Sequence, residues 1–205
     1  MEALNLTKVY VLTDTQGRII QCEGGYNPPS DLDGWVQIDE GEGDRYNLCQ
    51  RHYFAGGVLT NDGVPRYKLV DGLPIERVQE EIDADRLLVY KAAKIANSKA
   101  DLKRYLASHP LTWSDGEAYS ITLDKQAQLT ATLMSAQVDG EPPEWNTTGG
   151  QCRAWDVGEL SALGVSIKNR VKALVKYQQG QELAMDAAQT MAELEAIEVD
   201  YDTVQ

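Results

Sequence analysis

The stretch that most constrains the fold runs from Trp155 to Val199, near the carboxyl end of the 205-residue chain. Asp156 is a favourable N-cap residue, and five apolar residues then follow at spacings of three, four, four and three. They are Leu160, Leu163, Ile167, Val171 and Leu174. Because these spacings place all five on one helix face, we predict a long helix whose apolar face packs against another element or another chain.

A second, shorter helix is predicted after the long one. Thr190 and Glu193 form the Ser/Thr-x-x-Glu pattern of a capping box, and apolar residues follow it. Gly164 and Gly180 lie inside the longer stretch, where good helix formers are expected. The sequence therefore leaves open whether the long helix is continuous.

The first 76 residues predict a small antiparallel sheet. Strand-forming residues occur in short runs separated by turn sequences, of which Asp71-Gly72 is the strongest hairpin signal. The predicted strands are 9–13, 18–23, 34–38, 66–70 and 73–77.

A helical segment follows this sheet. Its apolar stripe is narrow and rich in alanine, a break near Asn97-Ser98 is left open, and His109-Pro110 ends it. Such a helix either links two modules or packs against copies of itself.

The remaining sequence predicts a strand at 118–123, a helix capped by Asp124, and a hairpin bracketed by Trp145 and Trp155. We therefore predict an α+β fold in three parts. These are an antiparallel β domain at 1–76, a helical linker at 77–108, and an α-rich domain at 109–205 with a β-hairpin, a long helix and a short helix.

Charge and composition restrict the classes of partner. The formal net charge of -13 argues against nucleic acid, which requires a concentrated basic surface. The amino terminus has no basic segment followed by an apolar run, and no stretch is long enough to span a membrane, so we expect synthesis in the cytoplasm. The cysteines Cys22, Cys49 and Cys152 are widely separated, which predicts reduced, buried thiols.

The sequence offers few groups for catalysis. It has two histidines, His52 and His109, and none of the spacings typical of a serine hydrolase, a zinc protease or a phosphate loop. The acidic segment 39–44 is interpreted as a solvated turn. We therefore predict no catalytic residue, no metal and no cofactor. The candidate interaction surface consists of aromatic residues: Trp35, Tyr46, Tyr53, Phe54, Trp113 and Trp145.

A resemblance to a known family rests on residues of the carboxyl-terminal half. The order Tyr119-Ser120-Ile121-Thr122, then Trp145-x-x-x-Gly149-Gly150, then a long helix, then Thr190-x-x-Glu193-Leu194 resembles a domain of unknown function found in bacteriophage tail-associated proteins. The resemblance covers about 95–200. The front half is similar to small prophage tail-region proteins, through segments such as Trp35-Val36-x-Ile38-Asp39-Glu40-Gly41.

This resemblance implies a phage or prophage product that joins, folds or extends the distal tail, and it supplies no catalytic residues. Its implied partner is another tail protein, a fibre or baseplate component, and tail fibres further suggest a homotrimer. The chain is then made in the host cytoplasm and joins the virion tail after assembly. Two alternatives stay open: a tail fibre assembly chaperone, and a polysaccharide-binding or polysaccharide-cleaving module for host recognition.

Overall fold

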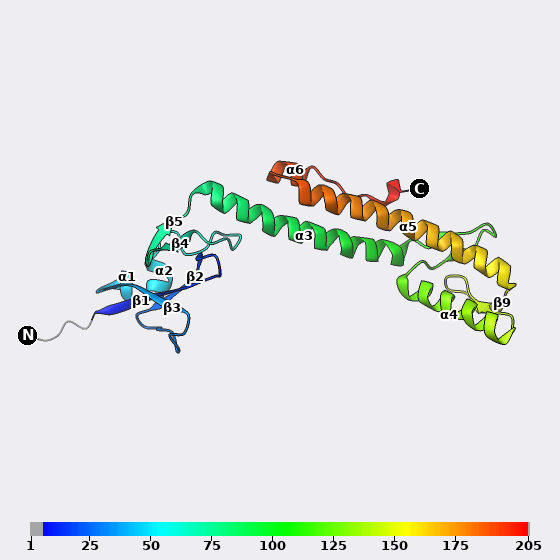
Figure 1. Ribbon diagram of the computed structural model, residues 1–205, viewed down its shortest axis with the longest axis horizontal. Coiled ribbons are helices and arrows are strands. Elements are labelled where there is room, and N and C mark those ends of the chain that lie inside the picture. Colours follow the sequence, from blue (N-terminus) through cyan, green and yellow to red (C-terminus); the bar gives the residue numbers. More distant parts are fainter. Residues whose placement is uncertain (1–5, 205) are drawn as a thin grey trace, which may run out of the picture. The chain divides into compact units, whose positions relative to one another are not determined.

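The computed structural model describes residues 6–204 and confirms the α+β class (Figure 1). Contacts between residues divide the chain into two compact units, Met1–Val89 and Tyr90–Gln205, and each unit is described separately below. The three-part division at residues 76 and 108 stays a prediction.

A three-stranded antiparallel sheet forms the centre of the first unit. Its strands are β1 (Thr7–Thr13), β2 (Ile19–Gly24) and β3 (Trp35–Gly41), in the order β2-β1-β3. Val9 and Val11 on the central strand are fully buried, as expected from the alternation of side chains along a strand. The predicted strands at 9–13, 18–23 and 34–38 are thus confirmed, with ends shifted by a few residues.

Short helices and a hairpin cover this sheet. The helices are α1 (Asp44–Asn47) and α2 (Cys49–His52), and the hairpin joins β4 (Tyr67–Val70) to β5 (Leu73–Glu76). Asp71 and Gly72 both have positive φ, 51° and 80°, which the predicted two-residue turn requires. The buried core of the unit consists of Val9, Val11, Ile19, Cys22, Cys49 and Phe54.

Helix α3 (Gln79–Ser108) begins in the first unit, where a buried arginine holds its first turns. Arg77 donates to the Asp85 carboxylate at 2.6 Å and to the carbonyl oxygens of Pro65 and Glu81 at 2.8 and 2.9 Å. Arg18, beside the sheet, donates to the same Asp85 carboxylate at 2.7 Å. Asp85 therefore connects the sheet, the hairpin and the helix through one shared acceptor.

In the second unit, α3 continues to Ser108 and five further helical or hairpin elements follow. They are the hairpin of β6 (Leu111–Thr112) and β7 (Ala118–Tyr119), α4 (Leu123–Asp139), the hairpin of β8 (Glu144–Trp145) and β9 (Arg153–Ala154), α5 (Val157–Ala187), and α6 (Met191–Glu195). A short 3-10 turn, η1 (Tyr201–Thr203), ends the described chain.

Two predictions near α4 are wrong in detail. Of the strand predicted at 118–123, only β7 at Ala118–Tyr119 forms. The N-cap of α4 is Thr122 instead of Asp124. The Thr122 hydroxyl accepts a hydrogen bond from the Lys125 N–H, so this residue already belongs to the start of the helix. Strand propensity in 118–123 is thus overridden by helix capping.

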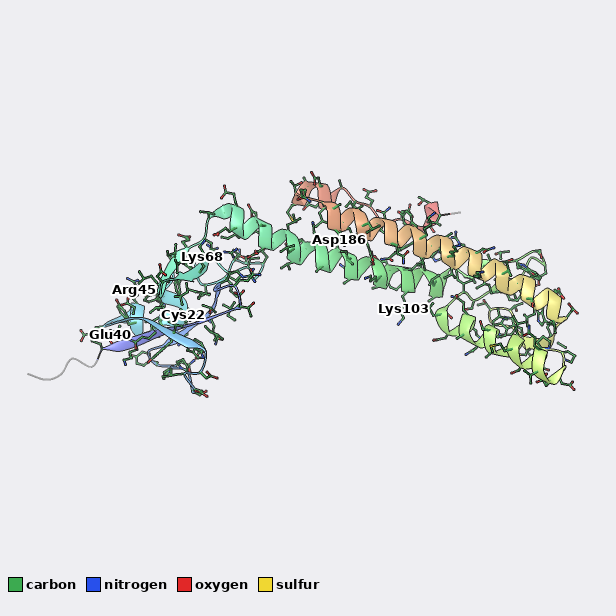
Figure 2. All side chains as sticks on the ribbon, in the orientation of Figure 1. Cys22, Glu40, Arg45, Lys68, Lys103 and Asp186 are labelled. Atoms are coloured by element: carbon green, nitrogen blue, oxygen red, sulfur yellow. The ribbon has the colours of Figure 1, made fainter. Side chains whose placement is uncertain are left out.

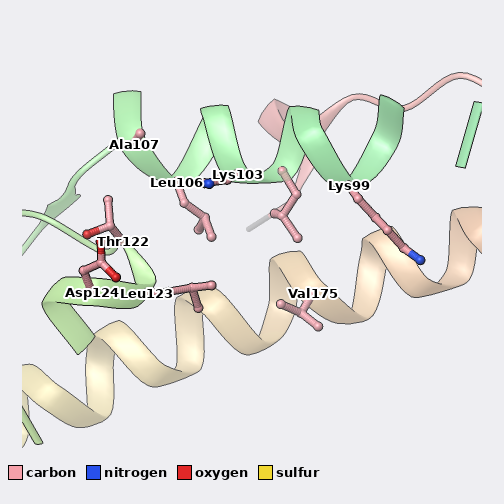
Figure 3. A pocket seen from close by; sticks show the side chains of 9 residues that line it. Lys99, Lys103, Leu106, Ala107, Thr122, Leu123, Asp124 and Val175 are labelled. Atoms are coloured by element: carbon pink, nitrogen blue, oxygen red, sulfur yellow. The ribbon is translucent and has the colours of Figure 1, made fainter. Parts of the chain in front are cut away.

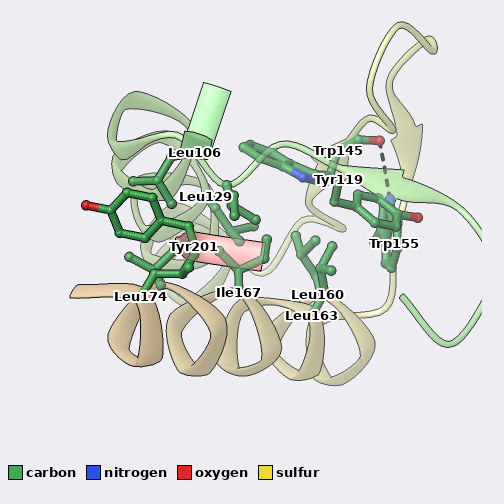
Figure 4. Packing of buried hydrophobic residues seen from close by; sticks show 12 residues of the cluster. Leu106, Tyr119, Leu129, Trp145, Trp155, Leu160, Leu163, Ile167, Leu174 and Tyr201 are labelled. Carbon is green, nitrogen blue, oxygen red and sulfur yellow. Dashed lines mark hydrogen bonds between the residues drawn. The ribbon is translucent and has the colours of Figure 1, made fainter. Parts of the chain in front are cut away.

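Helix α5 is continuous through Gly164 and Gly180, and Asp156 caps it as predicted. Leu160, Leu163, Ile167, Val171 and Leu174 are all buried, in a core that α3, α4, both hairpins and Tyr201 complete (Figure 4). Packing against other helices offsets the low helix propensity of the two glycines.

The carboxyl-terminal segment returns along α3 and α5. The Tyr201 hydroxyl donates to the Ser98 carbonyl at 2.8 Å, and Gln178 of α5 donates to the Ser98 hydroxyl at 3.1 Å. Ser98 is buried and α3 has no break there, so this polar contact joins two long helices and the chain end. The cap of α6 forms at Thr190, whose hydroxyl accepts from the Glu193 N–H at 3.1 Å.

Replacing Ile167 by Asp should lower the free energy of unfolding by about 3–5 kcal/mol, because it places an unpaired carboxylate in an apolar core. Ile167 is 2% exposed. Val165→Asp is the matched control, since that side chain lies on the same helix and is 54% exposed. Urea unfolding measures both, and equal losses in the two variants would contradict the buried position of Ile167.

Replacing Asp85 by Ala should lower the free energy of unfolding by about 2–4 kcal/mol, because the buried Arg77 guanidinium loses its close carboxylate at 2.6 Å and keeps only the more distant Glu81 at 3.9 Å. Asp83→Ala is the control, since Asp83 is more exposed and its ion pair with Arg86 lies at the surface. Chemical unfolding, followed by tyrosine and tryptophan fluorescence, compares the free energies of unfolding of the two variants. An Asp85→Ala protein as stable as the control would show that the ion pair is not needed.

Candidate interaction surface

The aromatic residues predicted to form an interaction surface lie in both units. In the first unit, Trp35 begins β3 and is partly exposed, whereas Phe54 is buried in the core. Tyr53 packs edge-on against Phe54 with ring centroids 5.0 Å apart, and Tyr46 packs against Tyr53 at 6.1 Å. Three of the four residues named in this unit thus form one contiguous cluster.

Asp39 binds this cluster through its carboxylate. Its Oδ2 accepts from the Tyr53 hydroxyl at 2.9 Å and from the Tyr46 hydroxyl at 3.2 Å. The Arg45 guanidinium lies 4.6 Å from the centre of the Tyr53 ring, on the exposed side. A Cβ atom at Gly41 would lie 2.3 Å from the Tyr46 ring, so a larger residue there would displace this ring.

Electrostatics in the cluster follow from these contacts. Burial, aided by the bond to Asp39, raises the pKa of Tyr53 to about 12. Burial also opposes ionisation of Asp39, but the hydrogen bonds from Tyr53, Tyr46 and the Glu40 N–H outweigh it and hold the pKa of this carboxyl below its usual value. Both hydroxyls already have an acceptor, so the cluster supplies local rigidity and leaves Arg45 as its exposed charge.

In the second unit, Trp113 is partly exposed and Trp145 is buried. The Trp145 carbonyl accepts from the Trp155 indole N–H at 3.2 Å, and Lys125 lies over the Trp145 ring at 5.0 Å. Trp113 contacts the Trp155 ring at a centroid distance of 5.9 Å. These tryptophans therefore anchor the two hairpins to the core.

A charged group closes the outer side of this tryptophan cluster. Arg153 lies over the Trp155 ring at 3.9 Å and is 3.7 Å from the Asp115 carboxylate. Asp115 also accepts from the buried Tyr119 hydroxyl at 2.6 Å. Burial and this hydrogen bond raise the pKa of Tyr119 to about 12.

An open groove of about 510 Å³ lies in the second unit between α3, the start of α4 and α5 (Figure 3). Apolar side chains dominate its lining, and Lys99, Lys103 and Asp124 are its charged members. Lys103 extends outward from α3 (Figure 2), whereas Lys99 pairs with Glu182 at 3.1 Å. The apolar lining consists of Leu102, Leu106, Ala107, Leu123 and Val175.

The sequence interpretation did not identify this groove. Its lining comes from three helices, so no single stretch carries its pattern. One local signal is Leu123, a large apolar residue directly after the N-cap, which is 66% exposed at the groove. An apolar lining edged by Lys103 and Asp124 suits a large apolar side chain.

Cys22 and Cys49 are buried together in the core of the first unit, where the Cys22 thiol donates to the Cys49 carbonyl oxygen at 3.7 Å. His52 ends α2, and His109 stacks on Tyr105 with ring centroids 4.0 Å apart. All three cysteines are free, but the expectation of burial is wrong for Cys152, which is exposed because it lies in the loop before β9. Among the described residues, no group of three or more His, Cys, Asp or Glu side chains is arranged to hold a metal ion.

Comparison with protein-family models, with curated proteins and with solved structures found no match to this chain. The class of the protein therefore rests on its fold and its candidate site. It is an α+β protein whose helical unit carries an open apolar groove. Over residues 6–204, no helix combines the length and apolar character that a membrane span requires.

Replacing Tyr53 by Phe should lower the free energy of unfolding by about 1 kcal/mol near neutral pH, because the ionised Asp39 loses a hydrogen bond. The pKa of Asp39 is lowered in the folded protein, so its contribution is present above the ordinary carboxyl pKa and is lost as pH falls through the folded value. The difference between the two proteins should therefore shrink in acid. Tyr26→Phe, at an exposed site, is the control, and a difference independent of pH would contradict the role of Asp39.

Proposed function

We propose that this chain is a non-enzymatic bacteriophage or prophage tail-associated protein that acts through protein–protein contacts. The observation that carries the proposal is the open groove between α3, α4 and α5, which is lined by leucines and bordered by Lys103. It lies within the region whose residue pattern resembles phage tail-associated proteins.

The groove favours a protein segment over a small molecule. Ligand pockets usually hold several polar groups that converge on the ligand. Here Thr122 already accepts a hydrogen bond from the backbone of α4, and Lys99 is paired with Glu182. What remains is apolar surface with Lys103 and Asp124 beside it, which fits a leucine-like or aromatic side chain of a protein partner.

The proposed partner is a fibre or baseplate component of the same tail. Apolar side chains of such a protein would fill the groove, and its polar neighbours would meet Lys103 and Asp124 at the edge.

Glycan recognition is less well supported. A sugar-binding aromatic residue presents an open ring face, but Trp145 is buried with Lys125 over its ring. Trp113 is partly exposed and belongs to the tryptophan cluster that anchors the first hairpin.

Replacing Leu123 by Glu should weaken binding of the purified full-length chain to its fibre or baseplate partner by about tenfold or more, because it removes apolar area that the partner would cover and places a carboxylate in an apolar groove. Leu183→Glu, at an exposed position of α5 outside the groove, should leave the affinity unchanged. Calorimetry with purified fibre and baseplate proteins of the same phage measures both. Equal affinity of the two variants would remove the groove from the interface.

Purified particles distinguish a structural component from an assembly chaperone. Mass spectrometry of virions should detect the chain if it is a tail part, whereas a chaperone is absent from particles and its deletion leaves fibres unassembled. A chain that is absent from virions, and whose deletion changes neither fibres nor infectivity, would overturn the proposal.

A further inference from the structure

Two free cysteines of the first unit lie next to each other in its core. Cys22, labelled in Figure 2, is on β2, and Cys49 is the first residue of α2. They are 4% and 1% exposed. The Cys22 thiol donates to the Cys49 carbonyl oxygen at 3.7 Å, and the two side chains also interact directly. Since these residues are 27 positions apart in the chain, the fold brings them together.

Gly24 shows on which side of β2 the Cys49 sulfur lies. Side chains alternate along a strand, so Cys22 and Gly24 face the same side of β2, and both are buried. A Cβ atom added to Gly24 would lie 3.2 Å from the Cys49 Sγ atom and 2.2 Å from the Lys8 carbonyl oxygen. The Cys49 sulfur therefore packs against the side of β2 that carries Cys22, where the missing side chain of Gly24 leaves room for it.

We propose that Cys22 and Cys49 are a modification site, a thiol pair that a low-molecular-weight disulfide oxidises to an intramolecular disulfide joining β2 to α2. The Cys49 thiol loses its proton, and the thiolate attacks one sulfur of the small disulfide. This step forms a mixed disulfide and releases one small thiolate, which takes up a proton. The Cys22 thiolate then attacks the Cys49 sulfur and releases the second small thiol. In total, two electrons and two protons pass from the cysteines to the small disulfide.

Helix α2 determines how the oxidant reaches these thiols. Burial raises the pKa of both Cys22 and Cys49, so the closed fold holds little thiolate. With only 4 residues, α2 depends on its packing, and it can open while the sheet stays folded. Opening of α2 exposes Cys49 and leaves Cys22 on its strand, which makes Cys49 the first nucleophile. When α2 closes again, the two sulfurs are brought together for the second step.

The bond would close a loop that contains β3 and α1. These elements lie between the two cysteines and carry Asp39 and Tyr46 of the aromatic cluster. A disulfide stabilises a fold mainly by restricting the unfolded chain, and by linkage the fold favours the disulfide by the same factor. The pair would thus remain as two thiols in a reducing compartment and become a crosslink in oxidising surroundings. The inference does not depend on the groove or on its partner.

Equilibration of the full-length Cys152→Ser chain with mixtures of reduced and oxidised glutathione tests the proposal, since this substitution removes the exposed third thiol. Acid quenching, alkylation in denaturant and intact mass spectrometry count the free thiols. The folded chain should lose both thiols without gaining glutathione, and peptide mapping should find Cys22 linked to Cys49. The equilibrium constant for oxidation should be at least about tenfold larger for the folded chain than for the same chain in urea.

Cys22→Ala and Cys49→Ala in the same background are the matched controls, because each keeps one thiol of the pair and neither can form the bond. Oxidation should raise the melting temperature of the Cys152→Ser chain by several degrees but should not raise that of the controls. Thiols that persist in the folded chain while the unfolded chain forms the bond would overturn the proposal. Glutathione attached to both cysteines, or equal equilibrium constants with and without urea, would overturn it as well. The comparison with urea uses only the Cys152→Ser chain, so it holds even if a control fails to fold.

Discussion

Burial of one apolar face of α5 holds the second unit together. The five residues from Leu160 to Leu174 lie on this face, and α3, α4, both hairpins and the chain end place side chains against them. Leu106 comes from α3, Leu129 from α4, the aromatic rings from the hairpins, and Tyr201 from the chain end. The area removed from water at this face stabilises elements too short to persist alone, such as the two-residue strands.

The first unit depends on a different kind of contact. Its apolar core is small, and the buried guanidinium of Arg77 adds a directional constraint that apolar packing does not supply. Asp85 lies on α3, and Arg18 and Arg77 lie on the sheet side, so the shared carboxylate fixes which face of the helix meets the sheet. Buried ion pairs of this kind select one arrangement even where their net energy is modest.

The exposed groove of the second unit arises where the start of α4 meets α3 and α5. Leu123 is 66% exposed there, directly after the N-cap of α4. Lys103 and Asp124 lie at the edge of the groove, and its other lining is mainly apolar.

The sequence alone determined the elements whose signal is local and periodic: the long helix with its buried face, the cap at Asp156, the hairpin at Asp71-Gly72 and the α+β class. Each depends on neighbouring residues, and so on spacing and turn chemistry. The three-dimensional structure decided the groove, the burial of Phe54 and Trp145, and the exposure of Cys152, since these depend on residues distant in the chain. Only the packing of Leu129 and Ala136 into the core showed which side of α4 is left uncovered.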